Sequence, residues 1–136
     1  MTLVYLDSSA AVKLILREDA SSPLQRFIQG ENPWQQALHL VGSDLVRVET
    51  IRACARSHPQ GAAKASELMS AISLVRISPA HIALGATHPP GELRTLDVLH
   101  LVTALSLTPE LAGMLTYDER LRESARAAGI KTFSPT

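Results

Sequence analysis

Short apolar runs alternate with helix-like segments along the chain, and this alternation restricts the fold more than any other feature. The runs have the length of strands and end at turn or capping residues, so we expect strands at 3–6, 37–41, 74–77, 111–117 and 130–133. Strands separated by helices favour a parallel sheet that is covered on both faces. The sequence therefore predicts an α/β fold, a three-layer α/β/α sandwich with a central parallel sheet of about five strands.

Helix signals fill the spaces between these strands. Serine, threonine or proline stands before or at the start of several segments, as is common at helix starts. Ser8-Ser9, Ser43 and Thr95 are the expected capping residues, and Pro89-Pro90-Gly91 is an expected loop. The expected helices cover residues 10–17, 23–29, 44–56, 62–72, 79–84, 96–106 and 119–128.

The size and composition indicate a folded protein with a substantial core. The chain has 136 residues, of which 46% are hydrophobic and 19% charged, and we expect a single domain over residues 1–136. Thirteen basic residues balance thirteen acidic ones. A zero net charge gives no overall attraction to nucleic acid, so any binding of RNA must rest on a local patch of basic residues.

The cysteine content and the apolar runs exclude several other classes of protein. A single cysteine, Cys54, allows no intramolecular disulfide and no cysteine-based zinc site, and its place within an expected helix predicts a core position. Asp7 interrupts the apolar start too early for a signal peptide. No apolar run approaches the roughly 20 residues of a membrane span, so we expect a cytoplasmic protein that does not enter a membrane.

Four acidic residues lie within or beside segments that otherwise have the composition of buried structure. Asp7 and Asp118 follow expected strands, Asp97 opens a nearly all-apolar helix, and Glu49 lies within another helix. Because the carboxyl ends of parallel strands share one edge of a sheet, Asp7 and Asp118 should lie there together. Two carboxylates about 4 Å apart repel by about 4 kcal/mol at an effective dielectric constant of 20. A hard divalent ion such as Mg²⁺ or Mn²⁺ would offset this repulsion.

Each acid also has a simpler explanation. Asp7 and Asp118 suit helix caps, and Asp97 suits the positive end of the helix that it opens. Glu49 forms one polar stripe with Arg52, which is typical of a solvent-exposed helix face with a weak ion pair. Capping does not explain why two acids end separate strands at the same edge, so both interpretations stay open at this point.

Other reactive side chains lack the pattern of a catalytic motif. His100 lies one turn after Asp97, and we expect it to be packed or to support the site rather than to bind a metal. Ser8-Ser9 is expected to start a helix rather than to supply a nucleophile, since no nucleophile-elbow pattern surrounds it. The sequence has no glycine-rich phosphate loop.

Around these acids the sequence resembles PIN-domain proteins, and specifically the VapC toxins of VapBC toxin–antitoxin pairs. Four matching segments follow one another in the order of that family. They are Tyr5-Leu6-Asp7-Ser8-Ser9-Ala10, Val48-Glu49 with Arg52-Ala53, Leu93-Arg94-Thr95-Leu96-Asp97-Val98-Leu99-His100-Leu101, and Leu115-Thr116-Tyr117-Asp118-Glu119-Arg120-Leu121.

The resemblance implies an endoribonuclease that depends on Mg²⁺ or Mn²⁺ and acts as the toxin of a type II toxin–antitoxin pair. The acidic quartet of the family maps onto Asp7, Glu49, Asp97 and Asp118 as catalytic and metal-binding residues, with Asp7 and Asp97 as the main metal-facing acids. The implied partners are RNA, a VapB-like antitoxin, and a second copy of the chain in a homodimer or a toxin–antitoxin hetero-oligomer.

Residues around the quartet are candidates for substrate contacts. Arg52 and Arg56 share the helical stripe of Glu49 and are expected to hold flanking phosphates. Thr116 matches the hydroxyl position that the family has beside its fourth acid, and it is a third candidate phosphate contact. Residues 25–40, including Trp34, match no part of the family pattern and are a candidate substrate or partner surface.

Three alternatives remain from the sequence. A housekeeping PIN-type RNA-processing nuclease would share the site, and a catalytically silent PIN-like binding module would keep the fold without the reaction. A phospho-acceptor signalling domain also places acids at the edge of a parallel sheet, but it needs a lysine after a strand. Lys13, Lys64 and Lys131 do not occupy such a position.

Overall fold

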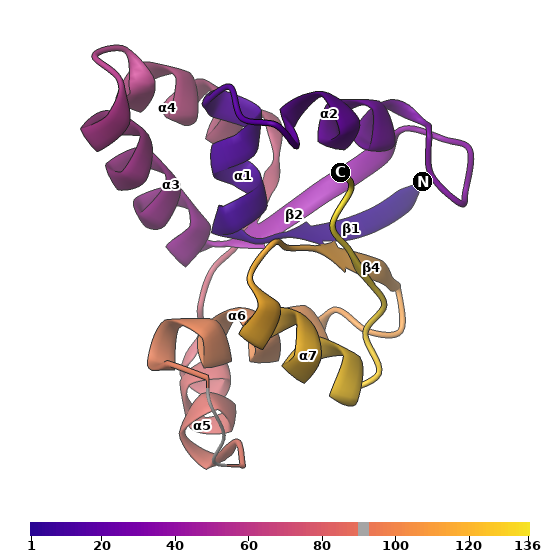
Figure 1. The fold of residues 1–136 in the computed structure, drawn as a ribbon. Coiled ribbons are helices and arrows are strands. Elements are labelled where there is room, and N and C mark those ends of the chain that lie inside the picture. Colours follow the sequence, from indigo (N-terminus) through magenta and orange to yellow (C-terminus); the bar gives the residue numbers. More distant parts are fainter. Residues whose placement is uncertain (90–92) are drawn as a thin grey trace.

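The computed structural model describes residues 1–89 and 93–136, and within these ranges it contains one five-stranded sheet (Figure 1). The strands are β1 (Thr2–Leu6), β2 (Leu38–Ser43), β3 (Ser73–Val75), β4 (Leu111–Leu115) and β5 (Thr132–Phe133). Their order across the sheet is β3-β2-β1-β4-β5, and every neighbouring pair is parallel. The predicted parallel sheet of about five strands is confirmed.

The two described ranges contain seven helices. They are α1 (Ser8–Ile15), α2 (Ser21–Gln29), α3 (Asp44–Ser57), α4 (Gly61–Ala71), α5 (Pro79–Thr87), α6 (Thr95–Ser106) and α7 (Glu119–Ala127). Of these helices, α5 packs on α6. The ends of helices and strands differ from the expected positions by at most three residues. None of the described helices combines the length and the apolar character that a membrane crossing needs.

The caps predicted at Ser8-Ser9 and Thr95 are wrong, whereas the cap at Ser43 and those considered for Asp7 and Asp118 are confirmed. Asp7, not Ser8-Ser9, caps α1, because its extended backbone lets the carboxylate accept a bond from the Ser9 amide. Arg94, not Thr95, stands at the N-cap position of α6, and its side chain makes no capping bond. Ser43 caps α3 as predicted. The predicted loop at 89–91 lies mostly outside the described residues.

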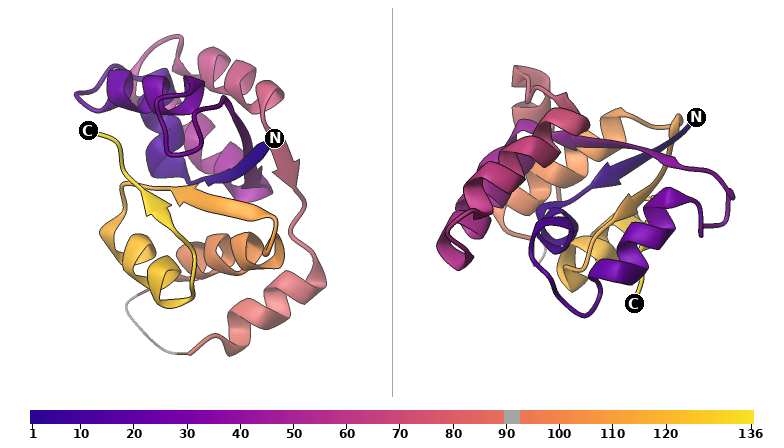
Figure 2. Two further views of the ribbon diagram at one scale, coloured as in Figure 1. Left: turned by 90° about the vertical axis from the view of Figure 1, so that its right-hand side faces the viewer. Right: turned by 90° about the horizontal axis from the view of Figure 1, so that it is seen from above.

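Side chains of the sheet alternate between two cores. Val4 and Leu6 pack with α1 to α4 on one face, and Tyr5 packs with α6 and α7 on the other. Figure 1 shows α1, α2, α3 and α4 above the sheet and α5, α6 and α7 below it, and Figure 2 shows the same separation from the side. The predicted α/β/α sandwich is therefore confirmed. Cys54 is fully buried on α3, as expected.

The central place of β1 decides where the acidic residues meet. β1 pairs with β2 on one side and with β4 on the other, and the Asp7 amide donates to the Leu115 carbonyl at 3.1 Å. The first residue after β1 therefore lies beside the end of β4. The segment from Leu115 to Asp118 leaves the sheet at the same edge, as the sequence predicts.

Residues 25–40 contain an aromatic cluster that helps to close one face of the sheet. The Trp34 ring packs edge-on against Phe27, with centroids 6.5 Å apart, and against Phe133, with centroids 5.3 Å apart. Phe27 and Phe133 also contact each other at 5.2 Å. Trp34 is partly buried against the core below α1 to α4, so these contacts give it a packing role.

Candidate active site

The four predicted acids line one hollow at the carboxyl edge of the sheet, which we call the acidic hollow. Asp7 comes from the end of β1, Glu49 from α3, Asp97 from the first turn of α6, and Asp118 from the start of α7. The rest of its lining is Ser8, Ser9, Val12, Val48, Arg52, Ala53, Arg56 and Leu96. The fold thus brings together all four acids from segments that are far apart in the sequence.

Asp7 is the most deeply buried of the four and is held by two hydroxyl groups. Its Oδ2 atom accepts from Ser9 Oγ at 2.6 Å and from Thr116 Oγ1 at 2.9 Å, and only 3% of the residue is exposed. A weaker bond from the Ser9 amide, at 3.4 Å, caps α1. Charge-assisted bonds of this kind fix the orientation of a carboxylate. The same acid therefore acts as a helix cap and faces the acidic hollow.

Thr116 links Asp7 to the fourth acid. Its hydroxyl donates to Asp7 and accepts from the Asp118 amide at 3.1 Å, while the residue is fully buried. Asp118 in turn caps α7, since its Oδ1 atom accepts from the Leu121 amide at 3.1 Å. Both hydrogen-bonding functions of the Thr116 hydroxyl are thus turned inward. In this arrangement the Thr116 hydroxyl orients two acids, and its contact with a substrate phosphate stays a prediction.

Asp97 carries the clearest electrostatic sign of a crowded acidic site. Burial raises the pKa of its carboxyl group, and the charges of Asp118 and Asp7 raise it further. The influence of His100 and of the Arg94 backbone opposes this rise without cancelling it. The negative charge of the acidic hollow is therefore not neutralised by the side chains around Asp97.

Glu49 is held from inside the protein by His100. The Nε2 atom of His100 lies 2.5 Å from Glu49 Oε1, and its Nδ1 atom lies 2.8 Å from the Tyr5 hydroxyl. Burial on its own lowers the pKa of the His100 imidazole, but the bond to Glu49 and the charges of Asp7, Glu49 and Asp97 raise it overall. His100 is fully buried and supports the site, as the sequence predicts.

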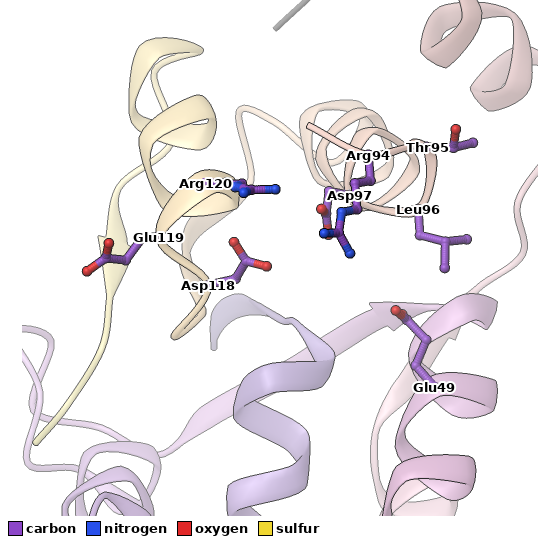
Figure 3. A pocket seen from close by; sticks show the side chains of 8 residues that line it. All are labelled: Glu49, Arg94, Thr95, Leu96, Asp97, Asp118, Glu119 and Arg120. Atoms are coloured by element: carbon purple, nitrogen blue, oxygen red, sulfur yellow. The ribbon is translucent and has the colours of Figure 1, made fainter. Parts of the chain in front are cut away.

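Four arginines lie along the acidic hollow and a second hollow beside it. Arg52 and Arg56 line the acidic hollow itself. The adjoining hollow shares Glu49, Leu96, Asp97 and Asp118 with the first and adds Arg94, Thr95, Glu119 and Arg120 (Figure 3). In Figure 3 the side chains of Arg120 and Asp118 both point from α7 towards α6.

These arginines are exposed, and within 1–89 and 93–136 none of the four forms an ion pair. Glu49 pairs with His100 rather than with Arg52, so the weak surface ion pair that the alternative interpretation predicted is absent there. Arg120 was missed by the sequence interpretation. The sequence signal for Arg120 was its position two residues after Asp118, in the first turn of the helix that follows this acid.

The donor atoms of the acidic hollow suit a hard divalent ion. All four acids offer carboxylate oxygens, and burial together with the charges of Asp118 and Asp7 raises the pKa of Asp97, which a bound cation would oppose. In the part of the chain that the structure describes, however, no three acidic, histidine or cysteine side chains already form a compact ligand set. The chemistry of the residues fits Mg²⁺ or Mn²⁺ with few direct ligands and several waters.

Comparison with known proteins identifies the fold and the relatives. A family model described as PIN domain matches residues 4–127. Ribonuclease VapC46 of Mycobacterium tuberculosis is 35% identical over 136 residues, which is 100% of both chains, and Ribonuclease VapC47 of the same species is 32% identical over 98% of this chain and 97% of its own.

Solved structures with the same fold include a Mycobacterium tuberculosis VapC20 described as a Sarcin-Ricin loop cleaving toxin. It superposes with a TM-score of 0.72 at 16% identity, covering 97% of this chain and 99% of its own. The VapBC2 complex of Rickettsia felis, solved with a DNA fragment from its promoter, gives a TM-score of 0.66 at 14% identity, covering 99% of this chain and 100% of the matched chain.

These matches place the chain in the class of PIN-type nucleases, and the four acids that line one hollow agree with this class. The chain belongs to the PIN-domain family and, within it, to the VapC ribonucleases, the toxin endoribonucleases of toxin–antitoxin systems. The family predicted from the four sequence segments is confirmed, and the phospho-acceptor alternative is excluded.

Proposed function

We propose that the acidic hollow is where this ribonuclease hydrolyses RNA phosphodiester bonds, with Mg²⁺ or Mn²⁺ as cofactor. One observation carries the proposal: four carboxylates, from the end of β1, from α3 and α6 and from the start of α7, line a single hollow, where burial and then the charges of Asp118 and Asp7 raise the pKa of Asp97. Such a site gains most from a bound divalent ion. Asp7 and Asp97 would hold the ion directly, with Glu49 and Asp118 closing the site partly through waters.

The chain's own residues prepare the reaction in three ways. Ser9 and Thr116 fix the Asp7 carboxylate, so the ion-binding acid is oriented before substrate arrives. Glu49 and Asp118 each have one carboxylate oxygen outside the bonds described above, and the free oxygen of one of these two acids would orient the attacking water and accept its proton. The ion, when bound, supplies positive charge for the leaving oxygen and for activation of the water.

We propose that the RNA backbone crosses the acidic hollow from α3 to α7. Arg52 and Arg56 would hold phosphates on the α3 side, and Arg94 and Arg120 would hold them on the side of α6 and α7. The two joined hollows support this path, because three of the four acids, Glu49, Asp97 and Asp118, lie in the part that the hollows share. Contacts with phosphates position a strand but do not read its bases, so all RNA sequences should be affected alike by their loss.

The proposed partners follow from the acidic charge and from the family. A VapB-like antitoxin would place a basic residue, an arginine by its planar pairing with carboxylates, in the acidic hollow. We also propose that the chain forms a homodimer or a toxin–antitoxin hetero-oligomer. Residues 1–136 would form one PIN-like domain. The protein would act in the cytoplasm, where RNA and the antitoxin are made. Co-expression with the neighbouring small gene, followed by pull-down, tests the partner.

Cleavage of purified total RNA tests the reaction. The wild-type protein should cleave RNA with Mg²⁺ or Mn²⁺ and lose this activity in EDTA, and Asp7→Asn should be inactive under both conditions. A 2′-deoxy nucleotide at the cleavage site should still allow cleavage, because water and not the 2′-hydroxyl attacks the phosphorus. Equal cleavage with and without EDTA, or by Asp7→Asn, would contradict the proposal.

A further inference from the structure

A buried chain of hydrogen bonds runs from the sheet to one acid of the acidic hollow. The Tyr5 hydroxyl, on β1, lies 2.8 Å from His100 Nδ1, and His100 Nε2, on α6, lies 2.5 Å from Glu49 Oε1 on α3. Tyr5 and His100 are both fully buried, whereas the Glu49 side chain is 26% exposed. The chain therefore connects three separate elements and ends at the solvent side in a carboxylate.

The proton positions follow from the donors available. The Tyr5 hydroxyl can donate its proton to His100 Nδ1 when the imidazole is neutral and this nitrogen carries a lone pair. With Nδ1 as acceptor, the proton of the imidazole lies on Nε2 and is donated to Glu49. The Ser43 hydroxyl, 3.4 Å from the same Nδ1 atom, lies on the same side of the ring. Tyr5 thus favours, for a neutral ring, the tautomer that donates to Glu49, and a protonated ring donates to Glu49 from the same Nε2 atom.

His100 cannot itself act on a substrate or a metal ion. It has no exposed surface, both of its ring nitrogens are engaged, and it lines neither of the two hollows. Its ring also packs edge-on against Tyr5, with centroids 5.9 Å apart and an interplanar angle of 77°. A role in the reaction must therefore pass through Glu49.

We propose that Tyr5 and His100 are positioning residues that fix one oxygen of Glu49, so that the other oxygen faces the acidic hollow in one orientation. The inference rests on the proposed function, in which Glu49 orients the attacking water. A free glutamate side chain has several rotamers, and a bond to a buried ring selects one of them. Misplacing such a group by about 1 Å can cost about 100-fold in rate.

Three variants separate positioning from packing. His100→Leu fills space but removes the donor to Glu49, His100→Gln keeps an amide N–H near the position of Nε2, and Tyr5→Phe removes only the hydroxyl. We expect kcat for RNA cleavage to fall about 10- to 100-fold in His100→Leu with KM nearly unchanged, to recover most of this loss in His100→Gln, and to fall a few-fold in Tyr5→Phe.

Thr103→Val is the matched control on the same helix. Thr103 is fully buried, and its hydroxyl donates to the Leu99 carbonyl on its own helix, so this variant loses a buried polar group without touching Glu49. It should lower stability and leave kcat unchanged. A kcat that follows stability in all four variants, or no recovery in His100→Gln, would overturn the positioning role.

A crystal structure of His100→Leu tests the inference without any activity. The Glu49 carboxylate should leave its wild-type position or lose its order, and an unchanged carboxylate would overturn the inference. Failure of the wild-type protein to cleave any RNA would instead contradict the proposed function, so the two failures can be told apart.

Discussion

Replacing Asp7 should show that one carboxylate both stabilises the fold and serves the site. In Asp7→Ala, the hydroxyl groups of Ser9 and Thr116 lose an acceptor at 2.6 and 2.9 Å, and α1 loses its cap. Hydrogen bonds to a charged group contribute about 1.5–3 kcal/mol each, and a lost cap costs about 1 kcal/mol. Removal of one charge relieves repulsion at Asp97 and offsets part of this loss.

The expected net change is a loss of about 2–4 kcal/mol in the free energy of unfolding for Asp7→Ala. Asp7→Asn should lose about 1 kcal/mol or less, because the amide oxygen can still accept from Ser9 and Thr116 while the charge is gone. Urea denaturation of the metal-free proteins in EDTA measures both values. Asp19→Asn, which changes an exposed acid after α1, is the control and should match the wild type.

A cycle with Thr116→Val sharpens this test. Because Thr116 and Asp7 share one hydrogen bond, the double variant should lose about 1 kcal/mol less than the sum of the two single variants. Strict additivity, or an Asp7→Ala protein as stable as the wild type, would mean that these hydroxyl groups do not hold the carboxylate.

Burial and the nearby carboxylates raise the pKa of the Asp97 carboxyl group. The folded protein therefore binds the Asp97 proton more tightly than the unfolded chain does. As a consequence, the folded state loses stability as the pH rises from the unfolded pKa through the raised pKa. Asp97→Asn should therefore unfold at a higher urea concentration than the wild type at pH 7 without metal, and this gain should vanish near pH 3.5. Trp34→Ala should lower the free energy of unfolding by about 2–3 kcal/mol through lost aromatic packing, with kcat unchanged below the unfolding temperature. Arg52→Ala and Arg94→Ala should each weaken binding of every single-stranded RNA and reduce the slope of log Kd against log salt by about 0.7, whereas Arg76→Ala should leave the slope unchanged in fluorescence anisotropy.

The sheet and the position of the acids could be predicted because they depend on local patterns. Apolar runs of strand length, separated by helix signals, leave few arrangements other than a covered parallel sheet. Asp7 and Asp118 directly follow such runs or lie three residues beyond them, so the edge that they share was predictable without any contact. The ends of elements were less certain, since Asp7 competes with Ser8-Ser9 for the same cap.

The contacts that give the site its detail could not be predicted in this way. The bond between His100 and Glu49 joins residues 51 positions apart, and it depends on how α3 and α6 pack on the sheet. Thr116 was identified from its position, but its inward orientation depends on the bond to Asp7 across 109 positions. Side chains that meet only through tertiary packing leave no periodic signal in the sequence.

Single-turnover cleavage of a defined RNA by Asp97→Asn, with Mn²⁺, separates the reaction at the acidic hollow from the stability of the fold. We expect this variant to be at least as stable as the wild type without metal and to cleave at least about 100-fold more slowly, whereas Asp19→Asn should cleave at the wild-type rate. Because stability and activity should move in opposite directions, unfolding cannot explain the loss. Cleavage by Asp97→Asn at the wild-type rate would contradict a metal-dependent reaction at the acidic hollow.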